Sequence, residues 1–137
     1  MPDSSPDFSV PAPGDRCPCR SGDTFAACCE PFIAGRTPAP TALQLMRSRY
    51  TAYTIGAVAH LLESWHPSTR PAALTLDPAT RWRSLEIVDT VAGGPFDDAG
   101  VVEFIARYRD ADGPGALHER SRFIRQAGRW RYVDAEG

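Results

Sequence analysis

The sequence predicts an α+β fold, in which helices pack on one face of a curved antiparallel sheet. Apolar residues recur with a helical period in the first half of the chain and alternate in the second half, where short turns divide the last segments. The 137 residues, 42% of them hydrophobic, suffice for one core with a small appendage. This composition argues against a disordered or fibrous chain.

A first helix is predicted to begin at Thr41, because TALQ fits a capping box in which Gln44 reaches back to the helix start. Gly56 suits the left-handed position that ends such a helix. A second helix over residues 58–65 must end before Pro67. The first helix carries an apolar stripe with spacings of three and four residues, formed by Leu43, Met46, Tyr50 and Tyr53.

Four strands are predicted in the second half, over residues 85–91, 101–110, 116–125 and 129–134. The short turns between the last three indicate antiparallel hairpins. On one strand Val102, Phe104, Ala106 and Tyr108 share a face. On the next strand one face carries Leu117, Glu119, Ser121 and Phe123, so its polar pair either lines a pocket or turns to solvent.

Charge and hydropathy make nucleic acid and membranes poor partners. The net charge is -2, and all fifteen cations are arginines, so the composition produces no strongly basic field. We see neither a secretory signal nor an apolar run of membrane-spanning length. These features predict a cytoplasmic protein that binds no membrane, with nucleic-acid binding disfavoured.

The four cysteines are the strongest chemical signal. Cys17 and Cys19 are one residue apart, and Cys28 and Cys29 follow as an adjacent pair. In a reducing compartment four clustered thiols favour a metal over disulfides, although pairing of Cys28 and Cys29 with the first two cysteines is conceivable. Four thiolates match one tetrahedral structural Zn²⁺ per chain, and iron would accept the same ligands. A cluster of small buried side chains is the third alternative.

These segments divide the chain into four parts. Residues 1–14 are rich in proline and small polar residues and predict a disordered tail. Residues 15–33 form the metal-binding module, and residues 34–40, with their proline and glycine, form a linker. Residues 41–137 form the α+β domain.

The stretch CPCRSGDTFAACC resembles the SEC-C motif, known from the C-terminal tail of the SecA translocation ATPase. The remainder resembles the YchJ (UPF0225) family through LMRSRYTAY, ESWHPSTRP, VEFIARY, HERSRF and GRWRYVD, in that order. The resemblance implies a SEC-C zinc-binding module followed by an NTF2-like domain with a conical pocket, in a family without an assigned reaction. It also implies contact with the SecB chaperone or the ribosome, although the lysines usual between the cysteine pairs are replaced here by Asp23, Thr24, Ala26 and Ala27.

Two functions follow from these observations. The first is a non-enzymatic adaptor whose SEC-C module docks a chaperone, secretion or ribosome-associated protein. The second is an enzyme or small-molecule binder that uses a pocket around Tyr53, His66, Glu119 and Ser121. No residue is assigned a catalytic role, because no nucleophile or cofactor fingerprint accompanies them. The arginines Arg47, Arg49, Arg120 and Arg122 are interpreted as solvated faces or, alternatively, as an anion-binding surface.

Overall fold

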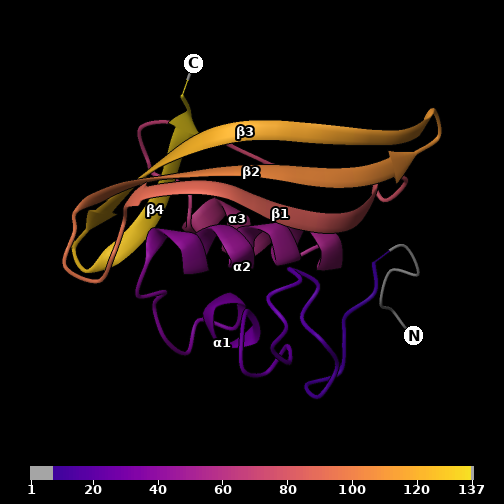
Figure 1. Ribbon diagram of the computed structural model, residues 1–137, viewed down its shortest axis with the longest axis horizontal. Coiled ribbons are helices and arrows are strands. Elements are labelled where there is room, and N and C mark those ends of the chain that lie inside the picture. Colours follow the sequence, from indigo (N-terminus) through magenta and orange to yellow (C-terminus); the bar gives the residue numbers. More distant parts are fainter. Residues whose placement is uncertain (1–7, 137) are drawn as a thin grey trace.

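The computed structural model describes residues 8–136, which form three layers (Figure 1). The first layer is a four-stranded antiparallel sheet in the order β1-β2-β3-β4, built from β1 (Arg81–Ala92), β2 (Ala99–Asp110), β3 (Gly113–Gln126) and β4 (Arg129–Ala135). The helices are α1 (Glu30–Ile33), α2 (Ala42–Ile55) and α3 (Val58–Glu63). Helix α2 lies against the sheet, and the N-terminal segment with α1 lies on the other side of α2. The predicted α+β class is confirmed.

The bounds of α2 follow from local chemistry. The Thr41 hydroxyl accepts a hydrogen bond from the backbone N–H of Gln44 at 3.1 Å and donates to Gln44 Oε1 at 2.9 Å. Gly56 ends the helix with a φ of 78°, in the left-handed region that glycine adopts without strain. The predicted start and end of this helix are confirmed.

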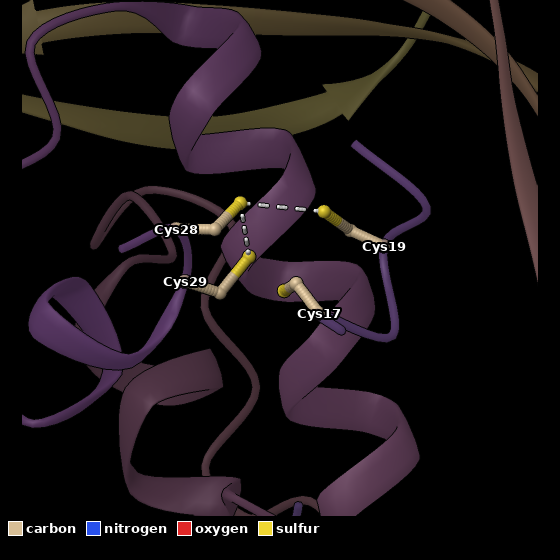
Figure 2. Close-up of side chains that lie close together, drawn as sticks. All are labelled: Cys17, Cys19, Cys28 and Cys29. Atoms are coloured by element: carbon tan, nitrogen blue, oxygen red, sulfur yellow. Dashed lines mark hydrogen bonds between the residues drawn. The ribbon is translucent and has the colours of Figure 1, made fainter. Parts of the chain in front are cut away.

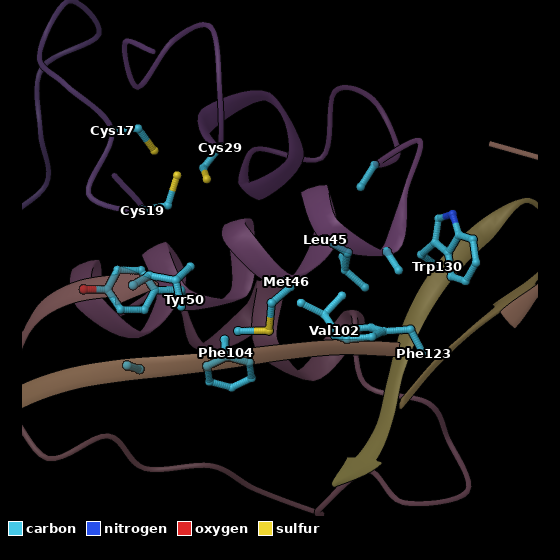
Figure 3. Close-up of a cluster of buried hydrophobic side chains, with 14 of the residues drawn as sticks. Cys17, Cys19, Cys29, Leu45, Met46, Tyr50, Val102, Phe104, Phe123 and Trp130 are labelled. Atoms are coloured by element: carbon cyan, nitrogen blue, oxygen red, sulfur yellow. The ribbon is translucent and has the colours of Figure 1, made fainter. Parts of the chain in front are cut away.

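Helix α2 is buried on more than one face, because the sheet covers one side and the cysteine segment covers another. Figure 3 shows Leu45, Met46 and Tyr50 between the cysteines and the strand side chains. Eight of its fourteen residues are buried, and they include polar ones: Ala42, Leu45, Met46, Ser48, Arg49, Tyr50, Thr51 and Ala52. One continuous core therefore joins the cysteine segment to the sheet.

The strands are longer than the sequence predicted. Strand β1 begins at Arg81 rather than at residue 85, after a turn in which the Ala79 N–H donates to Asp77 Oδ1 at 2.9 Å. Strand β3 begins at Gly113 rather than at residue 116. Its extra residues include Gly115, which pairs with Tyr108 and leaves space for the tyrosine ring. A Cβ atom on Gly115 would lie 2.6 Å from the Tyr108 ring.

The chain after α3 joins the edge of β4. The Tyr132 N–H donates to the Ser64 carbonyl at 2.8 Å, and the His66 N–H donates to the Tyr132 carbonyl at 2.7 Å. This pairing places Trp65 beside the Tyr132 ring, with ring centroids 5.2 Å apart. The longest described helix has 14 residues, and none of the helices within residues 8–136 has the length and apolar character of a membrane span.

The predicted disordered tail, residues 1–14, extends outside the described residues at positions 1–7. In its described part, the backbone N–H of Ala12 donates to Asp15 Oδ2 at 2.9 Å. In the predicted linker, Ala39 is buried and the Pro40 carbonyl accepts the indole N–H of Trp130 at 3.2 Å. The division into module, linker and main domain stays a prediction.

Candidate metal centre

Two turns carry the four cysteines. The first closes where the backbone N–H of Arg20 donates to the Cys17 carbonyl at 3.1 Å, and Arg20 adopts a left-handed φ of 66°. The second closes where the Cys28 N–H donates to the Phe25 carbonyl at 3.2 Å, and α1 begins directly after Cys29. A backbone hydrogen bond from Cys17 to the Asp23 carbonyl at 2.9 Å holds the loop between them. The local backbone therefore turns both cysteine pairs toward one point.

The four thiols converge there (Figure 2). Their sulfur atoms all lie within 4.8 Å of one another. The Cys19 and Cys28 sulfurs are 3.5 Å apart, and the Cys28 and Cys29 sulfurs are 3.8 Å apart. Four sulfurs around one tetrahedral Zn²⁺ would be separated by about 3.8 Å, as follows from a Zn–S distance of about 2.3 Å. All four thiols are free, so the arrangement fits a tetrahedral metal ion rather than disulfides.

The cluster is shielded from solvent. Cys17, Cys19 and Cys29 are buried and Cys28 is half-buried. The thiolates accept hydrogen bonds from neighbouring hydroxyls, since the Thr51 hydroxyl donates to Cys29 Sγ at 3.4 Å. The Ser21 hydroxyl lies 3.2 Å from Cys28 Sγ.

The pKa values of the thiols differ strongly within the cluster. Hydrogen bonding from Cys17 and Cys29 lowers the pKa of Cys19 far below its usual value. Burial raises the pKa of Cys28 to about 12, and hydrogen bonding to Cys17 and Cys19 raises the pKa of Cys29. Neighbouring thiolates repel one another in a buried site, so full ionisation requires a cation between the four sulfurs.

Hydrogen bonds from two arginines join the cysteine segment to α2 and to β1. Arg47 Nη1, from α2, donates to the Cys19 carbonyl at 3.0 Å. Arg20 Nη2 reaches across to the Arg83 carbonyl on β1 at 2.8 Å. Arg47 is half-buried, so the interpretation of a solvated helix face holds only in part, because its guanidinium also joins α2 to the first turn.

The pocket candidates are only partly brought together. Tyr53, Glu119 and Ser121 line one cavity of about 110 Å³ between α2 and the sheet. The polar pair on β3 therefore lines a pocket rather than facing solvent. His66 lies elsewhere, with Nδ1 2.7 Å from the Ser68 hydroxyl. His118 faces the other side of the sheet, where Nε2 lies 2.6 Å from Glu103 Oε2, because successive strand residues alternate in direction.

Arg49 also lines this cavity, a position that the sequence did not predict. Arg49 is 4% exposed, and Nη1 donates to the Leu61 carbonyl at 2.8 Å and to the Ser64 hydroxyl at 2.6 Å. The prediction of a solvated Arg49 is wrong. Arg49 lies three residues after Met46 and four before Tyr53, which places it on the apolar stripe of the helix. This spacing is the sequence feature that indicates its burial.

Comparison with known proteins agrees with this geometry. Residues 41–135 match the family described as YchJ, middle NTF2-like domain, and residues 15–31 match the SEC-C motif. The chain belongs to the YchJ (UPF0225) family. A UPF0225 protein of Streptomyces coelicolor is 50% identical over 124 residues, covering 90% of this chain and 97% of that protein. One of Chromobacterium violaceum is 49% identical over 121 residues, covering 85% of this chain and 89% of the relative.

Two solved structures share the fold of this YchJ family member. The solution structure of a SEC-C motif containing protein from Rhodopseudomonas palustris has a TM-score of 0.76 at 32% identity, covering 88% of this chain and 97% of that one. The crystal structure of a SEC-C motif containing protein from Psychrobacter arcticus has a TM-score of 0.70 at 26% identity, covering 86% of this chain and 80% of that one. The NTF2-like domain and the SEC-C motif expected from the resemblance are thereby confirmed.

Proposed function

We propose that this protein is a non-enzymatic binding protein whose SEC-C segment, held by one structural Zn²⁺, docks a protein partner. The convergence of four thiols within 4.8 Å is the observation that carries the metal part of the proposal. Four protein thiolates complete a tetrahedral coordination sphere and leave no position for water or substrate. The metal therefore supports the shape of the segment, and catalysis at the metal is not part of its role.

The chemistry of the thiols also supports a location. Four free cysteines close enough to oxidise in pairs persist where glutathione and thioredoxin keep thiols reduced. This is the condition of the cytoplasm, where chaperones, ribosomes and the cytoplasmic side of the secretion apparatus are the available partners. A partner of this class is consistent with a small docking segment that has an exposed turn.

The surface offered for docking is the outer side of the second turn. Ala26 and Ala27 are exposed there, whereas Phe25, at the start of the same turn, is 4% exposed and packs inward. Thr24 Oγ1 accepts the Ala27 N–H at 3.3 Å and fixes the turn. With neither lysine nor arginine at these positions, the surface suits a protein contact better than a phosphate backbone.

The metal part is tested by elemental analysis of protein purified without added metal. We expect one zinc per chain in the wild type and none in a Cys28→Ser/Cys29→Ser variant. Iron in place of zinc would change the identity of the metal but keep the structural role. A metal-free chain with two disulfides would disprove the metal centre.

The docking part is tested by affinity capture from a lysate of the source organism, with bound proteins identified by mass spectrometry. Ala26→Arg places a bulky charge on the proposed surface without touching the sulfurs. Ala111→Arg makes the same change in the exposed turn between β2 and β3 and serves as the control. We expect one partner to be retained by wild type and Ala111→Arg and lost by Ala26→Arg. Identical partner sets for all three proteins would disprove docking through this surface.

A further inference from the structure

A cavity of about 110 Å³ lies between α2 and the sheet, on the side of α2 that faces away from the cysteines. Its walls are mainly apolar and aromatic and include Met46, Trp82, Phe104 and Leu117. An apolar cavity of roughly 150 Å³ holds a molecule of benzene's size, so this cavity accommodates only a small ligand. Two polar features of the wall indicate what kind of ligand that is.

The first feature is the buried Arg49 guanidinium. Its Cζ lies 5.0 Å from the centre of the Trp65 ring and 4.6 Å from that of Tyr132. Within residues 8–136 no carboxylate oxygen forms an ion pair with it at 4.0 Å or less, and its Nη1 donates to the neutral oxygens of Leu61 and Ser64. Burial lowers the pKa of Arg49 to about 10, which leaves it a cation at neutral pH. The Glu119 carboxylate of the same cavity stabilises the Arg49 charge from a distance, but no described carboxylate contacts the guanidinium directly, and a bound anion would supply that direct contact.

The second feature is the indole N–H of Trp65. Within the described part of the chain, Trp65 Nε1 is buried and has no hydrogen-bond acceptor. An unsatisfied buried donor is unfavourable, and native proteins pair such groups with protein, water or ligand. Trp65 and Arg49 line the same cavity, and the Arg49 Cζ lies 5.0 Å from the centre of the Trp65 ring, so the two donor groups are adjacent in its wall.

Glu119 is the acidic residue of the cavity, and its Oε2 is occupied by other partners. The Ser121 hydroxyl donates to this oxygen at 2.6 Å, and the Tyr132 hydroxyl donates to it at 3.1 Å. These two donors compensate the Glu119 carboxylate within the wall. The Tyr132 side chain contacts both charged residues of the cavity, because its hydroxyl donates to Glu119 and its ring lies against Arg49. The donors left for a ligand are those of Arg49 and Trp65.

We propose that this cavity binds a small monocarboxylate, with the carboxylate against Arg49 and the Trp65 N–H and a short apolar tail against Met46, Phe104 and Leu117. A planar carboxylate accepts hydrogen bonds from a guanidinium fork on two oxygens, whereas a neutral amide presents only one acceptor. The aliphatic and aromatic walls then favour a tail of a few carbons over a second charged group. This site is separate from the metal centre and does not depend on the docking role of the SEC-C segment.

The test uses the metal-loaded full-length protein, labelled with ¹⁵N, and compares butyrate with butyramide. The two probes have nearly the same shape and differ in charge. We expect butyrate to shift the Trp65 indole signal and the backbone amide signals of Glu119 and Ser121 in a saturable manner, with a dissociation constant on the order of 1 mM. Butyramide should bind at least about tenfold more weakly, because it lacks the charge.

Two matched variants separate the ligand site from the fold. Trp65→Phe keeps an aromatic ring in the wall but removes the N–H, and we expect affinity for butyrate to fall about 10-fold or more. Trp130→Phe removes an indole N–H that donates to the Pro40 carbonyl outside the cavity, and we expect unchanged affinity. Equal binding of butyrate and butyramide, equal affinity of the two variants, or no saturable shift with butyrate would each overturn the proposal.

Discussion

The hydroxyl of Thr51, in the middle of α2, donates a hydrogen bond to the sulfur of Cys29 at 3.4 Å. The same oxygen lies 3.7 Å from the sulfur of Cys17. One side chain of the central helix therefore contacts a cysteine from each of the two turns. Both cysteines and Thr51 are buried, so this contact couples the metal centre to the core of the main domain.

Replacing Thr51 with valine should weaken metal binding without changing the helix. Valine keeps the branched shape and removes the donor to the thiolate, and loss of such outer partners lowers metal affinity about 10- to 100-fold. Competition with a chromophoric chelator measures the affinity. The control is Thr54→Val on the same helix, because the Thr54 hydroxyl donates to the Thr51 carbonyl at 2.7 Å and, among the described residues, forms no hydrogen bond with a cysteine. Equal affinity of the two variants would contradict the coupling.

Removing the metal should lower the stability of the whole chain, because Cys17, Cys19 and Cys29 belong to the same buried cluster as Leu45 and Tyr50. We expect a strong chelator to shift a single thermal transition downward by about 10 °C or more, as a structural metal contributes several kcal/mol. Scanning calorimetry with and without chelator measures this shift.

The matched control for metal removal is Cys19→Ser, which should melt at the lower temperature whether or not the chelator is present. Two separate transitions, with the main one unaffected by chelator, would show that the cysteine segment unfolds independently. That result would contradict the continuous core.

Stability should also fall with acid through His60. Burial, assisted by the nearby Arg49 cation, lowers the pKa of His60 to about 4, and its Nε2 lies 2.9 Å from the Ser48 hydroxyl. The unfolded chain, with a His pKa near 6.5, binds more protons between these values, so the free energy of unfolding decreases as pH falls from about 6.5 to 4. The loss amounts to roughly 3 kcal/mol once pH is below the folded pKa.

A titration of the His60 ring signals by NMR checks the pKa directly. Denaturant unfolding of wild type and His60→Gln at a series of pH values checks the consequence. Because both proteins keep the cysteines, protonation of the metal site affects them alike, and only the difference between their curves reports on His60. If the difference in free energy of unfolding between wild type and His60→Gln stays constant between pH 7 and pH 4, the lowered pKa of His60 is refuted.

The close approach of Gly93 to Gly100 across the β1–β2 hairpin should make Gly100 intolerant of a side chain. A Cβ atom there would lie 2.5 Å from the Gly93 Cα and 2.8 Å from the Gly93 nitrogen, so backbone must move. We expect Gly100→Ala to reduce the free energy of unfolding by about 1 to 3 kcal/mol. Gly14→Ala is the control, since a Cβ atom at Gly14 meets nothing within 4 Å. Denaturant unfolding of both variants measures the difference.

Local signals made part of this structure predictable. The capping pair Thr41 and Gln44 and the terminal Gly56 act within one helix, so α2 was located correctly from sequence. The cysteine cluster was equally accessible, because all its ligands fall within thirteen residues and two short turns bring them together. The alternation of β3 also contained the information that Glu119 and His118 point to opposite faces.

The burial of Arg49 depends on segments that lie far from it in the sequence. A charged residue on a helix is normally solvated, and only packing from distant segments makes another outcome possible. Here the Ser64 hydroxyl and the rings of Trp65 and Tyr132 surround the guanidinium, and these partners lie up to 83 positions away. The same holds for Thr51, whose polar side chain is fully buried because the cysteine segment packs on it.

The amino-acid sequence alone therefore specified the class of the fold, the limits of its central helix and the identity of the four thiols, since each depends on neighbours a few residues apart. Tertiary structure decided which polar side chains are buried and what they contact. It made Thr51 a partner of the cysteines and placed Arg49 in a cavity with Glu119. The physical reason is that α2 lies between two layers, so a helix that reads as amphipathic has no solvent-facing side along most of its length.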